Sequence, residues 1–287
     1  PALRRQFLLA TAAPVRLPHW HGRTFGRLHL QAHPDLELTF CEPAGPGQPA
    51  AALIGFMIDP WHPERTNADI LAAMFTPDGL TIGDVCASLD AIGGRFVLVA
   101  CLAGEIYILN DPCGLRTVCY LYRDGQFFAG SQPLLFNRVL PHTLEGRRYD
   151  EYMTSVYRRR TKEHWMPSGQ WLFDGVAHLV PNHFLQVSTG RQTRYWPRRE
   201  LPRRTAGEVI EPAGRMLQNL IGAAARRTPL ALPLTAGWDS RLLLAACRPV
   251  ADELFFYTMI YRDLTSSSPD IDIPRSLLST LGQQHHI

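Results

Sequence analysis

The C-terminal third of the chain shows the clearest alternation of apolar and polar segments. An apolar run at 231–234 leads through small and polar residues into a second apolar run, which predicts a strand, a loop and a helix that opens at Ser240. A β-rich apolar run follows at 254–259, and a Ser-Pro-Asp sequence at 268–270 predicts a helix that ends near Gly282. Because strands and helices alternate here, we expect a parallel sheet with helices on its faces.

The N-terminal part of the chain has the pattern of an antiparallel β domain. Strand-like apolar runs at 36–40 and 51–58 precede two segments with helical spacing, 67–75 and 82–92. Four short strands then follow in quick succession between residues 95 and 129, joined by turns that contain glycine. This succession predicts an antiparallel meander.

A long amphipathic segment and a charged segment before it indicate two domains. Apolar residues recur at helical spacing from 206 to 227, which predicts a helix whose apolar stripe packs onto the sheet. Residues 197–204 contain two prolines and dense charge and have no periodicity, so the domain boundary is expected there. We therefore predict domains at residues 1–197 and 205–287.

The loop between the first strand and helix, residues 234–240, has the chemistry of a phosphate site, and we call it the candidate loop. Thr235 and Ser240 supply hydroxyl groups, while Ala236 and Gly237 are small enough for the backbone to approach a ligand. The start of the following helix offers unpaired N–H groups and the positive end of a dipole to an anion. Asp239 would repel bound phosphates unless a cation lay between them, so it predicts a Mg²⁺ ligand.

Residues 235–240 read Thr-Ala-Gly-Trp-Asp-Ser, which resembles the Ser-Gly-Gly-x-Asp-Ser signature of the PP-loop ATP pyrophosphatases. A Walker A loop is excluded because no Gly-Lys-Ser/Thr sequence follows. The resemblance implies cleavage of ATP between the α and β phosphates, with AMP left on a carboxylate and pyrophosphate released. The ordinary alternative is a strand-turn-helix connection that binds nothing.

The flanking residues resemble the asparagine synthetase family. The Ser-Pro-Asp helix start, the Leu-Gly stop at 281–282 and the pair His285-His286 follow the candidate loop in the family's order. Residues 93–135 are similar to the second half of a class II glutamine amidotransferase domain, and 173–183 and 194–197 are similar to the strands that link it to the PP-loop domain. The resemblance implies a two-domain α/β and α+β protein. Its N-terminal domain would be of the glutaminase (Ntn hydrolase-like) type, and its C-terminal PP-loop (adenine nucleotide alpha hydrolase-like) domain would be incomplete.

The same resemblance implies which residues hold ATP. Main-chain atoms of Leu234 and Met259 would meet adenosine, and Asp239 would bind Mg²⁺. The expected ATP and pyrophosphate contacts are Leu234, Thr235, Ala236, Gly237, Ser240 and Met259.

Glutamine hydrolysis is not expected from this sequence. The family's nucleophile is an N-terminal cysteine, and residue 1 is Pro1. Residues 54–59 read Ile-Gly-Phe-Met-Ile-Asp where the family has Asn-Gly-Glu, so the groups that recognise glutamine are replaced by apolar ones. No catalytic residue is therefore assigned, and ammonia or an amine is the expected nucleophile.

The expected function is an ATP-dependent amide-forming ligase that joins a small-molecule carboxylate to ammonia or an amine, as in asparagine biosynthesis. Two alternatives stay open: a specialised amide ligase or cyclase of secondary metabolism, and a non-catalytic nucleotide-binding regulator. The chain also has the look of a fragment, because it stops after the second strand-helix unit. The residues that select the carboxylate would then lie beyond Ile287.

Composition narrows the class of partner. The net charge of +3 is spread over short arginine clusters without interleaved aromatic residues, so nucleic acid is not implied. No apolar run reaches the roughly 18 residues of a membrane span. The six cysteines lack CxxC spacing and are interpreted as reduced thiols, which favours a cytoplasmic protein. A homodimer is left open.

Overall fold

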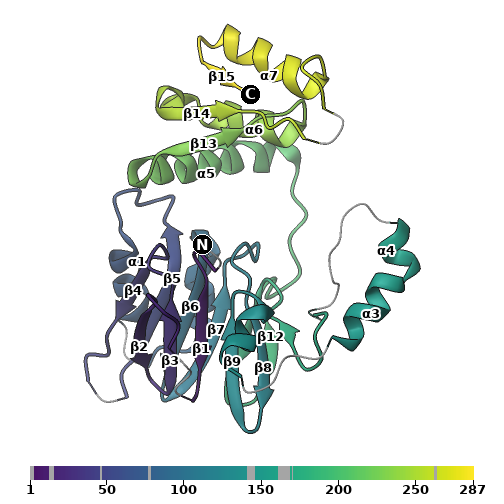
Figure 1. Cartoon of the computed structure of the whole chain (residues 1–287). Helices are drawn as coiled ribbons and strands as arrows, with labels where there is room; N and C mark the ends of the chain where they lie inside the picture. Colours follow the sequence, from purple (N-terminus) through teal and green to yellow (C-terminus); the bar gives the residue numbers. More distant parts are fainter. Residues whose placement is uncertain are drawn as a thin grey trace. The chain divides into compact units, whose positions relative to one another are not determined.

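The computed structural model of the protein describes residues 3–12, 16–45, 47–76, 79–140, 146–160, 169, 171–261 and 264–287. Pro1, where the family's nucleophile would stand, lies outside the described residues. The chain forms two compact units: Pro1–Met57 with Asn67–Leu201, and Ile58–Thr66 with Pro202–Ile287. Each unit is described on its own below, and Figure 1 shows their elements.

The first unit contains two six-stranded antiparallel sheets. The order of the first sheet is β10-β8-β9-β1-β3-β2, and that of the second is β12-β11-β7-β6-β5-β4. The strands of the first sheet are β1 Phe7–Ala10, β2 His21–Phe25, β3 Leu28–Ala32, β8 Cys119–Arg123, β9 Gln126–Gly130 and β10 Ala177–His178. Those of the second are β4 Leu38–Cys41, β5 Ala50–Ile58, β6 Gly93–Leu102, β7 Glu105–Asn110, β11 His183–Gln186 and β12 Arg191–Arg194.

Helical segments complete this unit. They are α1 Asn67–Phe75, α2 Ile82–Ser88, η1 Leu89–Ala91, η2 Pro133–Arg138, α3 Arg147–Thr154 and α4 Val156–Arg160. The helices α1 and α2 follow the expected segments 67–75 and 82–92. Strands β4 and β5 likewise lie within a residue or two of the predicted runs at 36–40 and 51–58.

Alternation along the strands builds the layers of the first unit. Val97 and Val99 on β6 face a core shared with β1, β3 and β9 of the first sheet. Phe96 and Leu98, one position away, face a second core with α1 and α2. A third apolar cluster covers the other face of the first sheet and includes Phe136 of η2. The second sheet is therefore buried on both faces, which explains the near-continuous apolar sequence of β5 and β6.

The predicted antiparallel meander at 95–129 is wrong in its pairing. All four strands are present, but they form two hairpins, β6 with β7 and β8 with β9, that lie in different sheets. The carboxylate of Asp111 holds the connection between them, because it accepts hydrogen bonds from the amides of Leu115 (2.8 Å) and Arg116 (2.8 Å). β11 then occupies the place beside β7 that a meander would give to β8.

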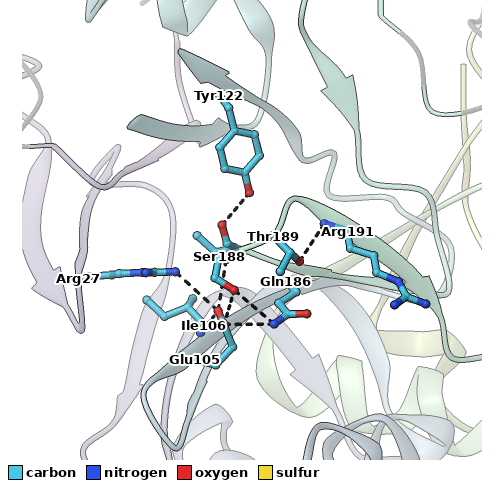
Figure 2. A network of polar contacts seen from close by, with 9 residues as sticks. Arg27, Glu105, Ile106, Tyr122, Gln186, Ser188, Thr189 and Arg191 are labelled. Atoms are coloured by element: carbon cyan, nitrogen blue, oxygen red, sulfur yellow. Dashed lines mark hydrogen bonds and ion pairs between the residues drawn. The ribbon is translucent and has the colours of Figure 1, made fainter. Parts of the chain in front are cut away.

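A polar network around Glu105 joins the β6–β7 hairpin to the β11–β12 hairpin (Figure 2). The Glu105 carboxylate accepts from the Ser188 hydroxyl, from Gln186 Nε2 (3.2 Å) and from the Ile106 amide (2.9 Å), and Arg27 lies 3.6 Å away. Burial alone would raise the pKa of Glu105. These hydrogen bonds outweigh that effect and leave the pKa below its ordinary value.

The second unit carries a three-stranded parallel sheet in the order β13-β14-β15. The expected parallel arrangement is thus present, with Leu230 paired to Leu254 and Phe256 to His285. Its elements are α5 Ala206–Arg227, β13 Leu230–Pro233, α6 Trp238–Ala246, η3 Arg248–Glu253, β14 Leu254–Tyr257, α7 Pro269–Thr280 and β15 His285–His286. Residues Ile221, Leu244 and Leu278 bring α5, α6 and α7 into one apolar cluster with Phe256 of β14.

Packing of the whole apolar stripe of α5 onto the sheet is not observed. Ile221 contacts the apolar cluster, but Ile210 is 69% exposed and Val209 and Met216 are also exposed. The reason is length: a helix of 22 residues extends about 33 Å, whereas a four-residue strand extends about 13 Å. None of the helices among the described residues is both long and apolar enough to cross a membrane.

Candidate functional site

The candidate loop lies at the carboxyl end of β13, where α6 begins. The helix was predicted to open at Ser240, but it begins at Trp238 with Gly237 as its N-cap. The apolar periodicity did not detect the first two residues of this helix, because Trp238 and Asp239 are both exposed to solvent and do not pack in the core. Asp239 therefore sits in the first turn of α6, where a carboxylate is favoured by the helix dipole.

Hydrogen bonds within the candidate loop fix its shape. The Thr235 amide donates to the Ser240 hydroxyl (3.1 Å), and the Thr235 and Ser240 hydroxyls are 3.1 Å apart. The Gly237 amide donates to Thr235 Oγ1 (3.1 Å). Thr235 and Ser240, the two residues expected to offer hydroxyl groups to a ligand, thus contact each other across the loop. Their hydroxyl groups hydrogen-bond within the loop.

A third amide of the loop is bound by a residue from a distant motif. The Ala236 N–H donates to Asp270 Oδ1 at 2.8 Å. Asp270 is in the first turn of α7, behind the Ser268 N-cap. From the sequence alone, stabilisation of its own helix start explains Asp270, and no sequence signal indicates that its carboxylate reaches the candidate loop.

Three amides at this place have no partner. The N–H groups of Trp238, Asp239 and Ser240 make no hydrogen bond within the part of the chain that the structure describes, and no side chain caps α6. Unpaired amides at the start of a helix bind anions. The free donors of the loop are therefore those of the helix rather than those of Ala236 and Gly237.

Asp239 is exposed and forms no ion pair among the described residues. Within the same residues, no group of three or more His, Cys, Asp or Glu side chains is arranged to hold a metal ion. Asp239 could therefore hold Mg²⁺ only together with nucleotide phosphates. That ion is often bound by one or two carboxylates and the phosphates of a nucleotide. Next to Asp239, Trp238 is 82% exposed, and the Arg241 guanidinium lies 4.4 Å from the centre of its ring.

The ends of β13 and β14 are tied together beside the loop. The Thr258 hydroxyl donates to the Leu234 carbonyl (2.8 Å), so it accepts from His285 Nε2 (2.8 Å) and fixes a proton on that nitrogen. His285 Nδ1 is buried and has no partner among the described residues. Burial, then the charges of Arg275 and His286, lower the pKa of His285, which favours this neutral form.

The two residues predicted to meet adenosine are placed differently from each other. Leu234 is 1% exposed and its amide donates to the Tyr257 carbonyl (2.8 Å). Met259 is 67% exposed and lies two residues beyond the end of β14. The sequence analysis predicted neither the link from Thr258 to His285 nor the strand β15 at His285–His286.

The segment at residues 54–59, at which the sequence analysis looked for glutamine-binding groups, is held by Asn67. Its side chain accepts from the Met57 amide (3.0 Å) and donates to the Gly55 carbonyl (3.1 Å). Ile54 and Met57 are fully buried. This segment therefore contributes to the core of the first unit.

The sequence matches no known protein-family profile and no curated protein. Among solved structures, the chain is similar to glutamine phosphoribosylpyrophosphate amidotransferase from B. subtilis complexed with ADP and GMP. The TM-score is 0.39 and the identity 11%, over 88% of this chain and 56% of that one. It is also similar to an allosteric regulatory enzyme of purine biosynthesis, with a TM-score of 0.39 and 9% identity over 95% of this chain and 64% of that one. The chain thus spans less than two thirds of either structure.

Proposed function

We propose that the protein is an ATP-dependent amide-forming ligase of the asparagine synthetase type. The hydrogen bond from the Ala236 amide to Asp270 carries this proposal. It joins the candidate loop and the Ser-Pro-Asp helix start, the two motifs of this unit that carry the family resemblance. Both lie at the carboxyl end of a parallel sheet, where ligands of α/β proteins bind.

The proposed reaction has two steps. A carboxylate oxygen of the substrate attacks the α-phosphorus of ATP, the bond to the bridging oxygen breaks, and pyrophosphate leaves. Ammonia or an amine then attacks the acyl carbon, AMP departs with its oxygen, and the nitrogen loses a proton. The free amides of Trp238, Asp239 and Ser240 would stabilise charge on the departing pyrophosphate.

The hydroxyls of Thr235 and Ser240 would exchange their mutual contact for phosphate oxygens. Asp239 would hold Mg²⁺, which supplies neutralisation of phosphate charge when bound. Main-chain atoms at Leu234 would meet adenosine, in a position fixed by the Thr258 hydroxyl.

Equilibrium binding of ATP with and without Mg²⁺ tests the nucleotide site. We expect the protein to bind MgATP, and Asp239→Ala to weaken that binding by about tenfold or more, equivalent to about 1.4 kcal/mol. Asp270→Ala should also weaken it, because the loop loses its anchor. Asp272→Ala is the matched control, since Asp272 lies in the same turn of α7 but pairs with Arg275 (2.6 Å). Failure of the unaltered protein to bind MgATP would refute the proposal.

Pyrophosphate release separates the kinds of ligase. The measurement uses aspartate, glutamate and peptide carboxylates in turn, with ammonia or an amine present. Release with aspartate favours asparagine formation, and release with peptides favours a specialised ligase or cyclase. Tight MgATP binding without pyrophosphate release for any carboxylate would contradict the ligase proposal and support a nucleotide-binding regulator.

A further inference from the structure

Three arginines of the first unit lie within electrostatic reach of one another. Arg95 is the third residue of β6, Arg116 follows the turn after β7, and Arg5 precedes β1. The charges of Arg95 and Arg5 both act on Arg116. None of the three forms a salt bridge within the described ranges of the chain.

Two of these side chains are held by backbone carbonyls. Arg116 Nε donates to the Arg95 carbonyl at 3.4 Å, and Arg95 Nε donates to the Leu115 carbonyl at 3.1 Å. Each bond uses one donor of a guanidinium that has five. The terminal NH groups of Arg95 and Arg116 have no partner among the described residues, so the donors suited to a planar anion stay free.

Gly55 makes room for Arg116. Its φ of +107° is one that side-chain-bearing residues rarely adopt, and a Cβ there would lie 2.9 Å from Arg116 Nε and 2.3 Å from the Arg95 carbonyl oxygen. The half-buried guanidinium thus occupies space that only glycine leaves open at this point of β5.

The acid that faces Arg116 is already engaged. Asp111 is fully buried, and its carboxylate accepts from the amides of Phe96 (3.3 Å), Leu115 (2.8 Å) and Arg116 (2.8 Å). Burial, followed by the charge of Arg95, lowers the pKa of Arg116 to about 10. The free-energy cost of burying the charged guanidinium of Arg116 would fall if an anion bound beside it.

We propose that Arg95 and Arg116, whose side chains each donate to a backbone carbonyl at the base of the other, form a binding site for a small oxyanion of the carboxylate or phosphate type. Guanidinium groups match the planar geometry of such anions and bind them through paired hydrogen bonds. Arg95 and Arg116 belong to the first unit, whereas the candidate loop belongs to the second.

The test follows the side-chain Nε–H resonances of arginine in the full chain. Sodium phosphate and sodium acetate are titrated separately, with sodium chloride at equal ionic strength as reference. We expect a saturable shift with at least one oxyanion. Arg116→Gln and Arg95→Gln should each weaken binding by about tenfold, which is about 1.4 kcal/mol.

Arg191→Gln is the matched control, because Arg191 is exposed and its guanidinium has no partner among the described residues. It removes one positive charge from the same unit and should leave the affinity unchanged. The anion that binds more tightly identifies the class of ligand. Equal shifts with chloride, or equal loss in Arg191→Gln and Arg116→Gln, would show nonspecific attraction and overturn the proposal. Far-UV circular dichroism checks the fold of each variant, and the two arginine variants serve as independent tests.

Discussion

Glu105 is a partly buried carboxylate whose ionised form the first unit stabilises. Its pKa lies below the ordinary value because hydrogen bonds from Ser188, Gln186 and the Ile106 amide outweigh burial. Such a group contributes stability that is present above its unfolded pKa of about 4.3 and is lost as the pH falls through its lower folded pKa. Glu105→Gln should therefore lower the free energy of unfolding by about 1–2 kcal/mol at neutral pH.

The measurement is urea unfolding of the protein and of Glu105→Gln from neutral to acidic pH. The difference between them should shrink once the pH falls below about 4, as the native carboxyl becomes protonated. Glu151→Gln provides the control, since Glu151 is exposed on α3 and should change stability little at any pH. A difference that stays constant into acid would contradict an ionic role for Glu105.

Thr258 supplies the hydroxyl that joins the ends of β13 and β15. Thr258→Val keeps the shape of the side chain but leaves the Leu234 carbonyl and His285 Nε2 without their partner in a place that is 3% exposed. A loss of about 1–3 kcal/mol is expected, because buried polar groups would be unsatisfied. Thermal or urea unfolding measures it, with the exposed Thr228→Val as control. Equal stability of the two variants would show that the link carries no energy.

At the scale of the element, α7 ends in a turn whose geometry requires glycine. Gly282 has φ +69°, its amide donates to Ser279, and the Gln283 amide donates to Leu278 (2.8 Å), which is the Schellman motif. Nothing lies within 4 Å of a Cβ at Gly282, so only the backbone conformation opposes a side chain. Gly282→Ala should cost about 1 kcal/mol.

Gly214 in α5 provides the opposite case. A methyl group added at Gly214 would also meet open space, but the backbone there is helical, so Gly214→Ala should raise stability by about 0.5–1 kcal/mol. The two variants are compared by urea unfolding. Stabilisation by Gly282→Ala as well as by Gly214→Ala would contradict the assignment of Gly282 to a left-handed cap.

Local patterns predicted elements well, and pairing between distant strands poorly. The apolar spacing located α1, α5 and the strand-helix succession of the second unit, because each depends on residues near in sequence. β1–β3 were missed: β2 is exposed at four of its five residues and so lacks the alternation of a half-buried strand. The meander failed because β7 pairs with β11, a strand distant in sequence, and no local pattern encodes such a pairing.

Prediction of the candidate site from the sequence was limited in the same way. Thr235, Gly237 and Ser240 were placed in one loop from their order in the chain, and they do contact one another. The bond from Ala236 to Asp270 depends on where α7 packs, which is a tertiary property. Spacing alone could not show it.

At the scale of the whole molecule, the segment before α5 is an exposed connection between the two units. Residues 198–205 are exposed throughout, and Arg199, Arg203 and Arg204 have no hydrogen bond or ion pair among the described residues. Exposed backbone without such contacts is the preferred substrate of proteases. Brief trypsin treatment of the native protein should therefore cut first after these arginines and yield two fragments, identified by mass spectrometry.

The contrast with Arg198 sharpens this prediction. Arg198 is paired with Asp90 and donates to the Cys86 carbonyl (3.4 Å), so its bond should be cut more slowly than those that follow it. Replacing Arg199, Arg203 and Arg204 by glutamine should slow the first cut without changing the unfolding midpoint, because these exposed side chains form no hydrogen bond or ion pair among the described residues. First cleavage within the β6–β7 hairpin instead would mean that the first unit opens before the connection does, since a cut requires backbone that is free of its ladder.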